Sequence, residues 1–560
     1  MSLTYAGISA GIAASALAAS YIKKRYESQE LWSRQWATLT EVRKWGLIGE
    51  RRVDAQGWPV PAFIYGSMKP NADIVFDWTT PDVSRHGLIS APTGAGKTWT
   101  TFYPTLTFGW THSCFVHVRK KEMAELTAGW RSEFGDVIWF DPTSMGSAKY
   151  NPMDRIRADG VYAFRDAQNI VESLSTSIGD GGDKGNPSFI EPAKDFASAA
   201  LVYCKTHSPL SRRNYSGMRA AFSDCKTLAQ LMVNNEHPHP EVRRELIVSA
   251  MQVLNNPSER FIGAVEGVIR SWLRPYQDIV LAYVTSRSDF SPEDLVTGPR
   301  PVTLYVHLPP SDDDRLAPFV NLLISQIIDE LMTWEKVTRS GSVKRWQFAW
   351  IIDEAWRLGK VASLEGALAD MRSYGMRTLL GVQGLNQIID HYGVYNSVFN
   401  NCRWVTSWQN GFDECKHVAD MLGEEERERK SYTHGNGMFG PTGSSSVSRS
   451  MEWRPVIQAA HVSRIPKNRI IVFGEEKPIF AHRTHKDAWQ KLVRPLKPKA
   501  RVTGEFLAGP INLPSGDLLS SLTRFLPGPP RTPLLPPPGG SSGPTEPPSS
   551  PLPKRPRRRL

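Results

Sequence analysis

The stretch "APTGAGKT", residues 91–98, decides how the rest of the chain is interpreted. It fits the phosphate-binding loop pattern G-x-x-x-x-G-K-[ST] except at its first position, where Ala91 stands in place of glycine. A triphosphate needs backbone N–H groups and a helix N-terminus close to its oxygens, and Gly94, Ala95 and Gly96 are small enough to allow this approach. Alanine is also small, so we interpret Ala91 as a tolerated variant.

The chemistry of the loop depends on its last two residues. Lys97 would reach the β and γ phosphates as a mobile positive charge, and the Thr98 hydroxyl would bind Mg²⁺. The alternative is a chance match. The flanking sequence favours a real site, because residues 85–90 have the pattern of a buried strand and residues 96–110 that of a helix start. The predicted nucleotide-binding residues are Ala91, Pro92, Thr93, Gly94, Ala95, Gly96, Lys97 and Thr98.

The net charge of +11 is concentrated at the two ends of the 560-residue chain. Residues 1–26 contribute +3 and residues 527–560 contribute +5, which leaves +3 for the body. A charge this small is no argument for DNA binding, although local positive charge can still line a pore. The five cysteines are odd in number and lack C-x-x-C pairing, so they indicate neither a disulfide framework nor a zinc site.

Residues 3–22 contain no charged residue and have the length that a helix needs to cross a bilayer. Lys23, Lys24 and Arg25 follow at once, which favours an uncleaved anchor with the body in the cytoplasm over a secretory signal. The segment is rich in alanine, glycine and serine, so a surface amphipathic helix or a soluble helix is the alternative. We predict one N-terminal membrane anchor.

Strand and helix patterns alternate after the loop, which predicts an α/β fold with a parallel sheet. Strands are expected at 113–118 and 135–141. From 156 to 288 the apolar spacing is helical with few strand signals, so we predict an inserted all-α domain. A strand at 301–309 and a helix at 317–337 follow it.

Two segments towards the C-terminus lack these patterns. Residues 431–450, rich in glycine and serine, follow the charged run 423–430 and are expected to form a mobile loop. The proline-rich residues from 527 onwards end in "KRPRRRL" and are expected to be a disordered tail. Contact between this tail and an acidic partner or nucleic acid is the alternative.

An ATPase also needs an acid for Mg²⁺ and a group that orients or deprotonates water. Residues 347–360, "QFAWIIDEAWRLGK", offer both, because an apolar strand over 348–352 would place Asp353 and Glu354 at the edge where open α/β sheets bind ligands. Asp353 would hold Mg²⁺ and Glu354 would act as the base. The alternative is that these are two exposed acids after an ordinary strand. The phosphate-binding loop disfavours this alternative, because a P-loop ATPase needs both features.

A third apolar strand, expected at 378–384, contains Gln383 near its end. A glutamine beside the metal-binding acid would hydrogen-bond the γ phosphate or the attacking water. Many glutamines at strand ends have no such role.

Taken in order, these motifs resemble the coupling proteins of type IV secretion and conjugation, the TraG/TraD family of DNA-transfer ATPases. The resemblance spans roughly residues 60–485. The stretches that carry it are "HGLISAPTGAGKT", "KKEMAELTAGWR", "FDPTSMGSAKYNPMD", "TLYVHLPPSDDDR", "WIIDEAWRLGK", "YGMRTLLGVQGLNQI" and "FNNCR". The resemblance implies a RecA-like P-loop ATPase core interrupted by an all-α domain, an N-terminal membrane anchor, and a ring of six subunits around a channel.

The resemblance also implies roles for individual residues. Asp353 and Thr98 would bind Mg²⁺, and Glu354, Gln383 and Arg372 would be catalytic. Arg372, in "ADMRSYGMR", lies where the family places an arginine that completes the site of the neighbouring subunit. A solvated helix arginine is the alternative, and Arg377 or Arg403 would be the replacement.

Three features depart from the family pattern. Where the family often has "D-x-K-G-E", this chain has Val118 and Lys121 in "VRKKE", so a role for that acid is in doubt here. The usual anchor is a pair of helices, whereas this chain has one candidate. The proline-rich tail is not typical of the family.

The sequence therefore predicts six segments. They are a membrane anchor at 1–26, a juxtamembrane region at 27–70, the two parts of a nucleotide-binding domain at 71–155 and 289–495, the all-α insert at 156–288, and a C-terminal extension at 496–560. The predicted protein is a hexameric ATPase of the bacterial inner membrane, with its bulk in the cytoplasm. It would use ATP hydrolysis to move a relaxase-bound DNA strand into a type IV secretion channel.

Two other functions are compatible with the sequence. A motor with different cargo would be a septal-type translocase of double-stranded DNA or a protein-secretion ATPase. A protein of another class would be a receptor and scaffold, in which nucleotide only holds the ring together.

Overall fold

The computed structural model describes most of the chain. The described residues are 36–48, 60–69, 73–77, 86–158, 160–178, 189–222, 224–333, 335–359, 361–394, 396–407, 411–434, 445–473, 476–483 and 502–503. The predicted anchor and the proline-rich tail lie outside them. Within the described residues, no helix combines the length and apolar character needed to cross a membrane.

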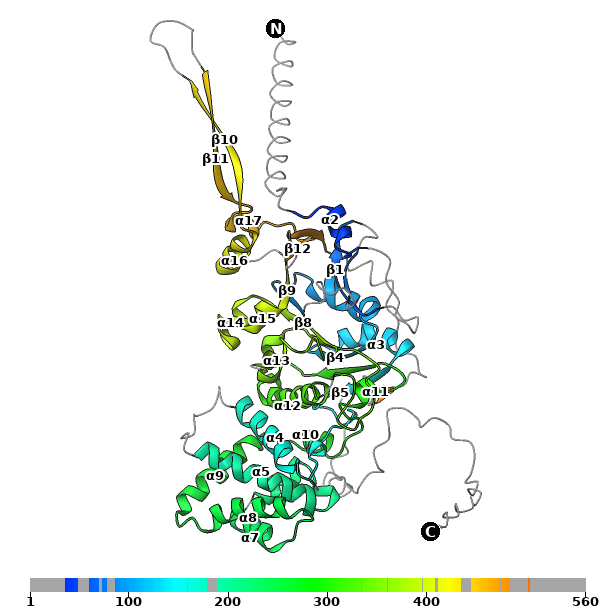
Figure 1. Ribbon diagram of the computed structural model, residues 1–560, viewed down its shortest axis with the longest axis vertical. Helices are drawn as coiled ribbons and strands as arrows, with labels where there is room; N and C mark the ends of the chain where they lie inside the picture. Colours follow the sequence, from blue (N-terminus) through cyan, green and yellow to red (C-terminus); the bar gives the residue numbers. More distant parts are fainter. Residues whose placement is uncertain are drawn as a thin grey trace, which may run out of the picture.

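One large sheet forms the centre of the molecule (Figure 1). Its strands lie in the order β14-β5-β6-β4-β7-β8-β3-β9-β12-β13-β1-β2. Their bounds are β1 Ala62–Ser67, β2 Asp73–Asp77, β3 His86–Ser90, β4 Ser113–Val118, β5 Asp136–Phe140, β6 Val302–His307, β7 Phe348–Ile352, β8 Met376–Val382, β9 Cys402–Thr406, β12 Arg469–Val472, β13 Ile479–His482 and β14 Val502–Thr503.

The sheet is mixed rather than wholly parallel. From β14 to β9 all neighbouring strands are parallel, as the sequence predicted, whereas β12, β13, β1 and β2 add antiparallel pairs. The sheet also extends past the predicted limits of the nucleotide-binding segments, because β1 falls within 27–70 and β14 within 496–560. These short outer strands pair with edges that would otherwise be open.

Strands β3 to β9 are buried at every residue because both faces of the sheet are covered. In β4, Cys114, Val116 and Val118 belong to one hydrophobic core, and Phe115 between them belongs to the core on the other face. This alternation follows from the two-residue repeat of a strand. Helix α3, Glu122–Phe134, and the π-helical turns η1, Thr98–Phe102, and η2, Thr105–Gly109, cover the first face.

The second face is covered by helices that follow the central strands. These elements are α12 Asp313–Leu331, η7 Ala355–Leu358, α13 Ala362–Ala367, α14 Asn386–Tyr392, α15 Ser397–Asn401, α16 Phe412–Leu422 and α17 Ala459–Val462. Helix α2, Leu39–Lys44, precedes the sheet and begins with a capping box formed by Thr38 and Glu41.

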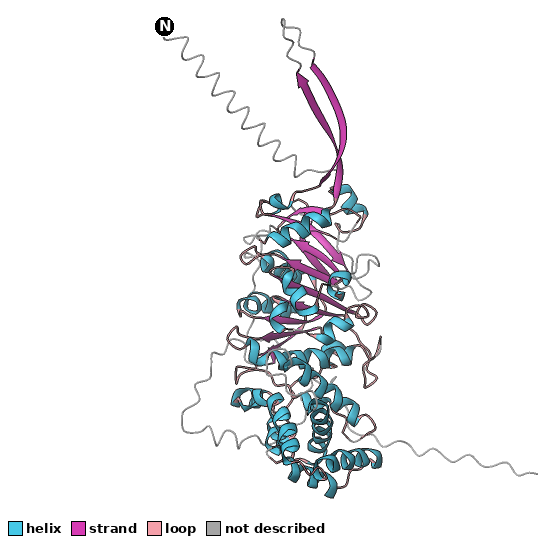
Figure 2. Cartoon of the chain, turned by 90° about the vertical axis from the view of Figure 1, so that its left-hand side faces the viewer, coloured by secondary structure: helices cyan, strands magenta, loops and turns pink. Residues whose placement is uncertain are grey.

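Between β5 and β6 the described residues form helices and turns without a strand. They are η3 Pro152–Arg155, α4 Ala163–Ile178, α5 Ile190–His207, η5 Leu210–Arg212, α6 Tyr215–Ala221, α7 Cys225–Asn234, α8 Pro240–Leu254, α9 Glu259–Trp272, η6 Arg274–Gln277, α10 Ile279–Val284 and α11 Asp294–Thr297. Side chains of Asn214, Asp224 and Ser258 cap the N-termini of α6, α7 and α9. We call residues 152–297 the helical segment, and Figures 1 and 2 show it at one end of the molecule.

A two-stranded ribbon projects from the opposite end (Figures 1 and 2). Its strands, β10 Glu424–His434 and β11 Ser445–Pro455, pair in antiparallel register from Glu424 with Pro455 to His434 with Ser445. The prediction of a loop over 431–450 was therefore wrong for residues 431–434 and 445–450. The serines suggested a turn, but in β11 Ser448 and Ser450 alternate with the larger residues Arg449 and Met451, a period that suits a strand.

Helix α12 begins four residues before the predicted start and ends six residues before the predicted end. Three aspartates precede or occupy its first turn, where the helix dipole favours negative charge. Beyond its end, Arg339 donates to the carbonyl of Asp329 and Lys344 to that of Leu331. These cations satisfy carbonyls that the helix itself leaves free.

Arg131 of α3 connects this helix to the amino ends of β4 and β6, and its side chain is fully buried. Its guanidinium donates to the carbonyls of Trp110 and His112 and, over 2.7 Å, to the Thr303 hydroxyl of β6. Removal of the guanidinium would leave buried acceptors without a donor.

We therefore expect Arg131→Met to lower the free energy of unfolding by about 2–4 kcal/mol. Urea denaturation followed by circular dichroism measures this change. The control is Arg244→Met, which alters an exposed arginine of α8 and should change stability by less than about 0.5 kcal/mol. Equal stability of the two variants would contradict the assigned role.

Candidate functional site

Residues 91–98 form a compact loop between β3 and η1. Gly94 and Gly96 have φ angles of +77° and +81°, a region that side chains other than glycine rarely adopt. The N–H of Ala95 donates to the carbonyl of Pro92 over 3.1 Å and closes the turn. Ala91 is buried with a negative φ, so its position needs a small residue rather than glycine. The loop geometry thus supports the interpretation of Ala91 as a tolerated variant.

Lys97 lies at the start of the helical turn η1, and its Nζ donates to the carbonyl of Ala91 over 2.7 Å. Burial lowers the pKa of the Lys97 ammonium, while the negative charges of Asp353 and Glu354 oppose this shift. The Lys97 ammonium therefore lies beside the loop, near the carboxylates of Asp353 and Glu354. Arg483, which follows β13, donates to the carbonyl of Ala95 on the other side of the loop.

The loop and the acid pair meet in space although 255 residues separate them in sequence. The Thr98 hydroxyl donates to Oδ2 of Asp353 over 3.0 Å. This contact arises because β8 lies between β3 and β7, and all three parallel strands end at the same edge of the sheet. Burial raises the pKa of Asp353, and Lys97 and the Thr98 hydroxyl act against that increase.

Asp353 fits its position because the adjacent strand provides space. A Cβ at Gly381 of β8 would lie 2.7 Å from Oδ1 of Asp353 and 2.9 Å from the ring of Phe102. The same Oδ1 accepts a hydrogen bond from the N–H of Glu354 over 3.0 Å. The sequence contained Gly381 in "TLLGVQG", but its role depends on which strands are neighbours.

Glu354 has a strained backbone and a fully engaged side chain. Its φ and ψ are +55° and +49°, and it is the one non-glycine residue with positive φ among the residues that the structure describes. Oε1 accepts from Nε2 of Gln383 over 3.2 Å, and Oε2 accepts from the guanidinium of Arg119. Burial favours a higher pKa for Glu354, but the hydrogen bond and charge of Arg119 hold it below its usual value.

Arg119 was not predicted from the sequence as a site residue, although it lies in the stretch "VRKKE" at residues 118–122. Arg119 follows β4, the neighbour of β7, and therefore reaches the same edge of the sheet. A cation directly after a strand is the signal in the sequence, but it identifies Arg119 only once β4 is known to be the neighbour of β7. Val118 beside Arg119 is fully buried, and Nζ of Lys121 lies 3.9 Å from Oδ2 of Asp141.

The three candidate arginines are far from this edge of the sheet. Arg372 is exposed and lies four residues before β8 begins, so it is at the amino ends of the strands. The seven residues of β8 separate it from Gln383 by about 23 Å at 3.3 Å per residue. Arg377 and Arg403 are 4% and 1% exposed, and Arg403 lies 4.0 Å from the ring centre of Phe76.

Gly381 generates a direct structural prediction. Gly381→Ala should lower the free energy of unfolding by about 1–3 kcal/mol, because the added methyl group overlaps Asp353 and Phe102. Thermal denaturation of the purified variant measures the loss. Gly366→Ala in α13 is the matched control, since a Cβ there meets nothing within 4 Å, and an unchanged or slightly higher stability is expected. Similar behaviour of both variants would refute the role of Gly381.

Comparison with known proteins connects this site to a family. Residues 36–494 match the family model described as type IV secretory system conjugative DNA transfer. A conjugal transfer protein TraG of Escherichia coli is 29% identical over 416 residues, which are 70% of this chain and 64% of the relative. A second TraG of the same species is 27% identical over 79% of this chain and 72% of its own length.

A VirD4 protein of Rhizobium rhizogenes is 24% identical over 80% of this chain and 64% of its own length. The chain thus spans less than two thirds of two of these three relatives. Among solved structures, the bacterial conjugative coupling protein TrwB in complex with sulphate has a TM-score of 0.54 at 17% identity, over 84% of this chain and 96% of that one. TrwB in complex with ADP and Mg²⁺ has a TM-score of 0.52 at 16% identity, over 80% and 98%. These similarities show a shared α/β fold.

Proposed function

The chain belongs to the family of type IV secretory system conjugative DNA transfer proteins, the coupling proteins of conjugation, and on this premise we propose that it is an ATPase that moves DNA into a secretion channel. The observation that carries the proposal is the contact between Thr98 and Asp353. It joins a phosphate-binding loop to an acid pair at one edge of the sheet, which is the arrangement that P-loop hydrolysis requires.

The residues present fit ATP and Mg²⁺. Gly94 and Gly96 hold the loop in a backbone conformation that leaves room for phosphate oxygens, and residues 91–98 lead into the helical turn η1. The Thr98 hydroxyl and the Asp353 carboxylate are adjacent oxygen donors, the ligand type that Mg²⁺ prefers. The related TrwB in complex with ADP and Mg²⁺ supports the same choice for this chain.

Each side chain has a separable task in the proposed reaction. Lys97 would exchange the Ala91 carbonyl for phosphate oxygens, and Mg²⁺, when bound, would neutralise developing charge on the phosphates. Glu354 would accept a proton from the attacking water, and Gln383, one hydrogen bond away, would orient that water or contact the γ phosphate. Arg119 and Arg483 border this site on either side.

We further propose that the active form is a ring of six subunits. Arg372 cannot serve the site of its own chain, because β8 separates the two ends of the sheet. An arginine supplied to the neighbouring subunit solves this geometric problem and contributes about 10³ to 10⁵ in rate in P-loop enzymes. The partners of the ring would be a relaxase–DNA complex and type IV channel components, with residues 3–22 as the anchor in the inner membrane.

Two variants separate binding from turnover. Lys97→Ala should abolish ATP binding, whereas Glu354→Gln should retain binding and lose hydrolysis by about 10² or more, because it keeps the shape of the side chain but not its basicity. Calorimetry measures binding and phosphate release measures turnover. Normal hydrolysis by either variant would refute the site assignment.

A mixing experiment tests the contribution of Arg372 to a neighbouring site. Arg372→Ala and Lys97→Ala should each be inactive, and their mixture should recover hydrolysis because a Lys97→Ala subunit still offers Arg372 to an intact loop. Arg377→Ala and Arg403→Ala should fail this complementation, since these buried arginines would act through stability. Absence of recovery in the mixture would contradict a shared site.

The cargo is tested by adding DNA to the wild-type protein. A DNA motor should hydrolyse ATP faster with DNA, whereas a protein-secretion ATPase would be indifferent to it. Full DNA transfer in cells that carry only Glu354→Gln would instead favour a nucleotide-held receptor and scaffold.

A further inference from the structure

We propose that Arg119 is a positioning residue that restrains Glu354 and connects it, through Asp313 and α12, to the helical segment. The inference rests on the proposed function, since it describes how hydrolysis at that site is regulated. A shift of the helical segment on binding of DNA, the cargo in the proposed function, would then release Glu354 and start turnover.

The Glu354 carboxylate is occupied on both of its oxygens. Arg119 donates to its Oε2 and Gln383 donates to its Oε1, so both carboxylate oxygens are engaged by protein groups. An oxygen that already accepts a charge-assisted bond from a guanidinium is less available to a water molecule. The proposed base is therefore bound both to Arg119 and to Gln383, the residue predicted to orient water.

Arg119 also forms an ion pair with Asp313. Its Nη2 lies 2.8 Å from Oδ2 of Asp313, whose side chain is 4% exposed. Asp313 is the first residue of α12 and also faces Arg357 of η7 at 3.8 Å. Because Asp313 is nearly buried and Arg119 only slightly exposed, the ion pair ties the start of α12 to the position of Arg119.

The C-terminal half of α12 contacts the residues that lead into the helical segment. The helix has 19 residues and is about 28 Å long at 1.5 Å per residue. In its C-terminal half, Gln326 donates to the carbonyl of Pro152 over 3.0 Å and accepts from the Tyr150 hydroxyl over 2.8 Å. Glu330 forms an ion pair with Arg155. These partners stand where the chain enters the helical segment.

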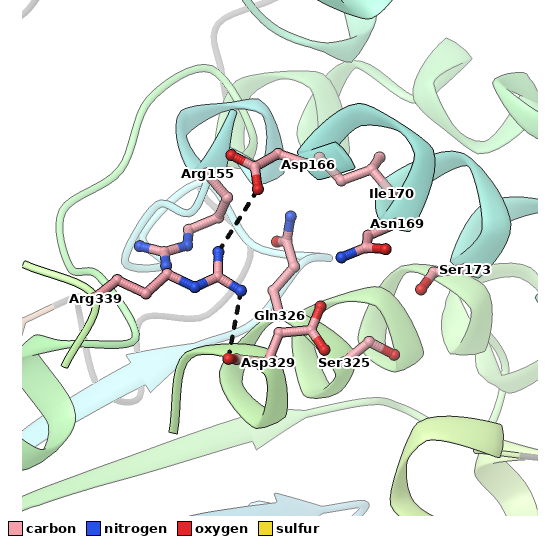
Figure 3. Close-up of a pocket in the computed structure, with 9 residues that line it drawn as sticks. All are labelled: Arg155, Asp166, Asn169, Ile170, Ser173, Ser325, Gln326, Asp329 and Arg339. Carbon is pink, nitrogen blue, oxygen red and sulfur yellow. Dashed lines mark hydrogen bonds and ion pairs between the residues drawn. The ribbon is translucent and has the colours of Figure 1, made fainter. Parts of the chain in front are cut away.

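The junction between α12 and the helical segment combines apolar packing, such as that of Phe319 against Tyr276, with ionic and hydrogen-bonding contacts. Figure 3 shows a small cavity there, between α4 and the C-terminal half of α12. Arg339 donates to the carbonyl of Asp329 over 3.3 Å and lies 3.9 Å from Asp166 of α4. Charged contacts across such a cavity can exchange partners when the helical segment shifts, and the packed helix then passes that shift to Asp313.

The decisive variant is Arg119→Gln, which removes the charge but keeps a polar side chain. We expect kcat without DNA to rise roughly three- to ten-fold, as a base freed from an ion pair would allow. The Kd for a non-hydrolysable ATP analogue and the KM for ATP should not change, and stimulation by single-stranded DNA should fall towards one-fold. Arg119→Lys retains the charge and should restore low basal turnover.

A second variant isolates the connection to α12. Asp313→Asn leaves Arg119 and Glu354 paired, so basal turnover should stay low while stimulation by DNA is lost. Hydrogen exchange gives a readout that does not require hydrolysis: DNA should alter exchange at residues 313–331 and 352–358 in the wild type, and only at 313–331 in Asp313→Asn. Arg357→Gln, which faces Asp313 but not Glu354, is the matched control.

A lower kcat in Arg119→Gln with unchanged analogue binding would mean that Arg119 assists Glu354, and would overturn the inference. Unchanged basal turnover and unchanged stimulation would overturn it as well. If Arg119→Gln does not fold, Asp313→Asn decides, because full stimulation in that variant contradicts the link. Failure of the proposed function looks different, since the wild type itself would then bind no ATP or ignore DNA.

Discussion

The hydrogen bond between Thr98 and Asp353 depends on strand order more than on any local feature. Strand β8 lies between β3 and β7, and the parallel direction of all three brings their following residues to one edge. The helical segment adds more than a hundred residues between the two halves without disturbing this order, because it leaves the sheet after β5 and returns at β6. The site therefore belongs to the sheet, and the inserted helices pack against the core through α12 and α11.

Backbone strain at Glu354 is part of the same arrangement. A left-handed conformation costs a residue other than glycine about 1–3 kcal/mol, and such strain is typical of functional positions. Here the bond from the Glu354 N–H to Asp353 and the contacts of its side chain to Gln383 and Arg119 hold the conformation. The turn directs the carboxylate towards the residues that follow the neighbouring strands instead of along the continuation of β7.

Much of the fold was predictable because apolar runs and loop motifs are local signals. The strands ending before Ala91 and Asp353 lie within a residue or two of their predicted bounds, and Gln383 directly follows β8. Arg119, Asp313 and Gly381 were not predictable from pattern alone, since their roles depend on which strands and helices become neighbours. The ribbon β10–β11 was missed because its serines resemble a turn and its strands carry no continuous apolar face.

The position of β3 also has a consequence for the synthesis of this protein. Its two sheet neighbours are β8 and β9, and 286 residues separate Ser90 from the first residue of β8. At 5–20 residues per second, a ribosome needs about 15 to 60 s to supply them. During that interval a nascent strand that is fully buried in the folded protein has no strand neighbour, and such segments are prone to aggregate. Strand β3 is thus enclosed only after β8 and β9 have been made, and until then its protection from aggregation will depend on chaperones.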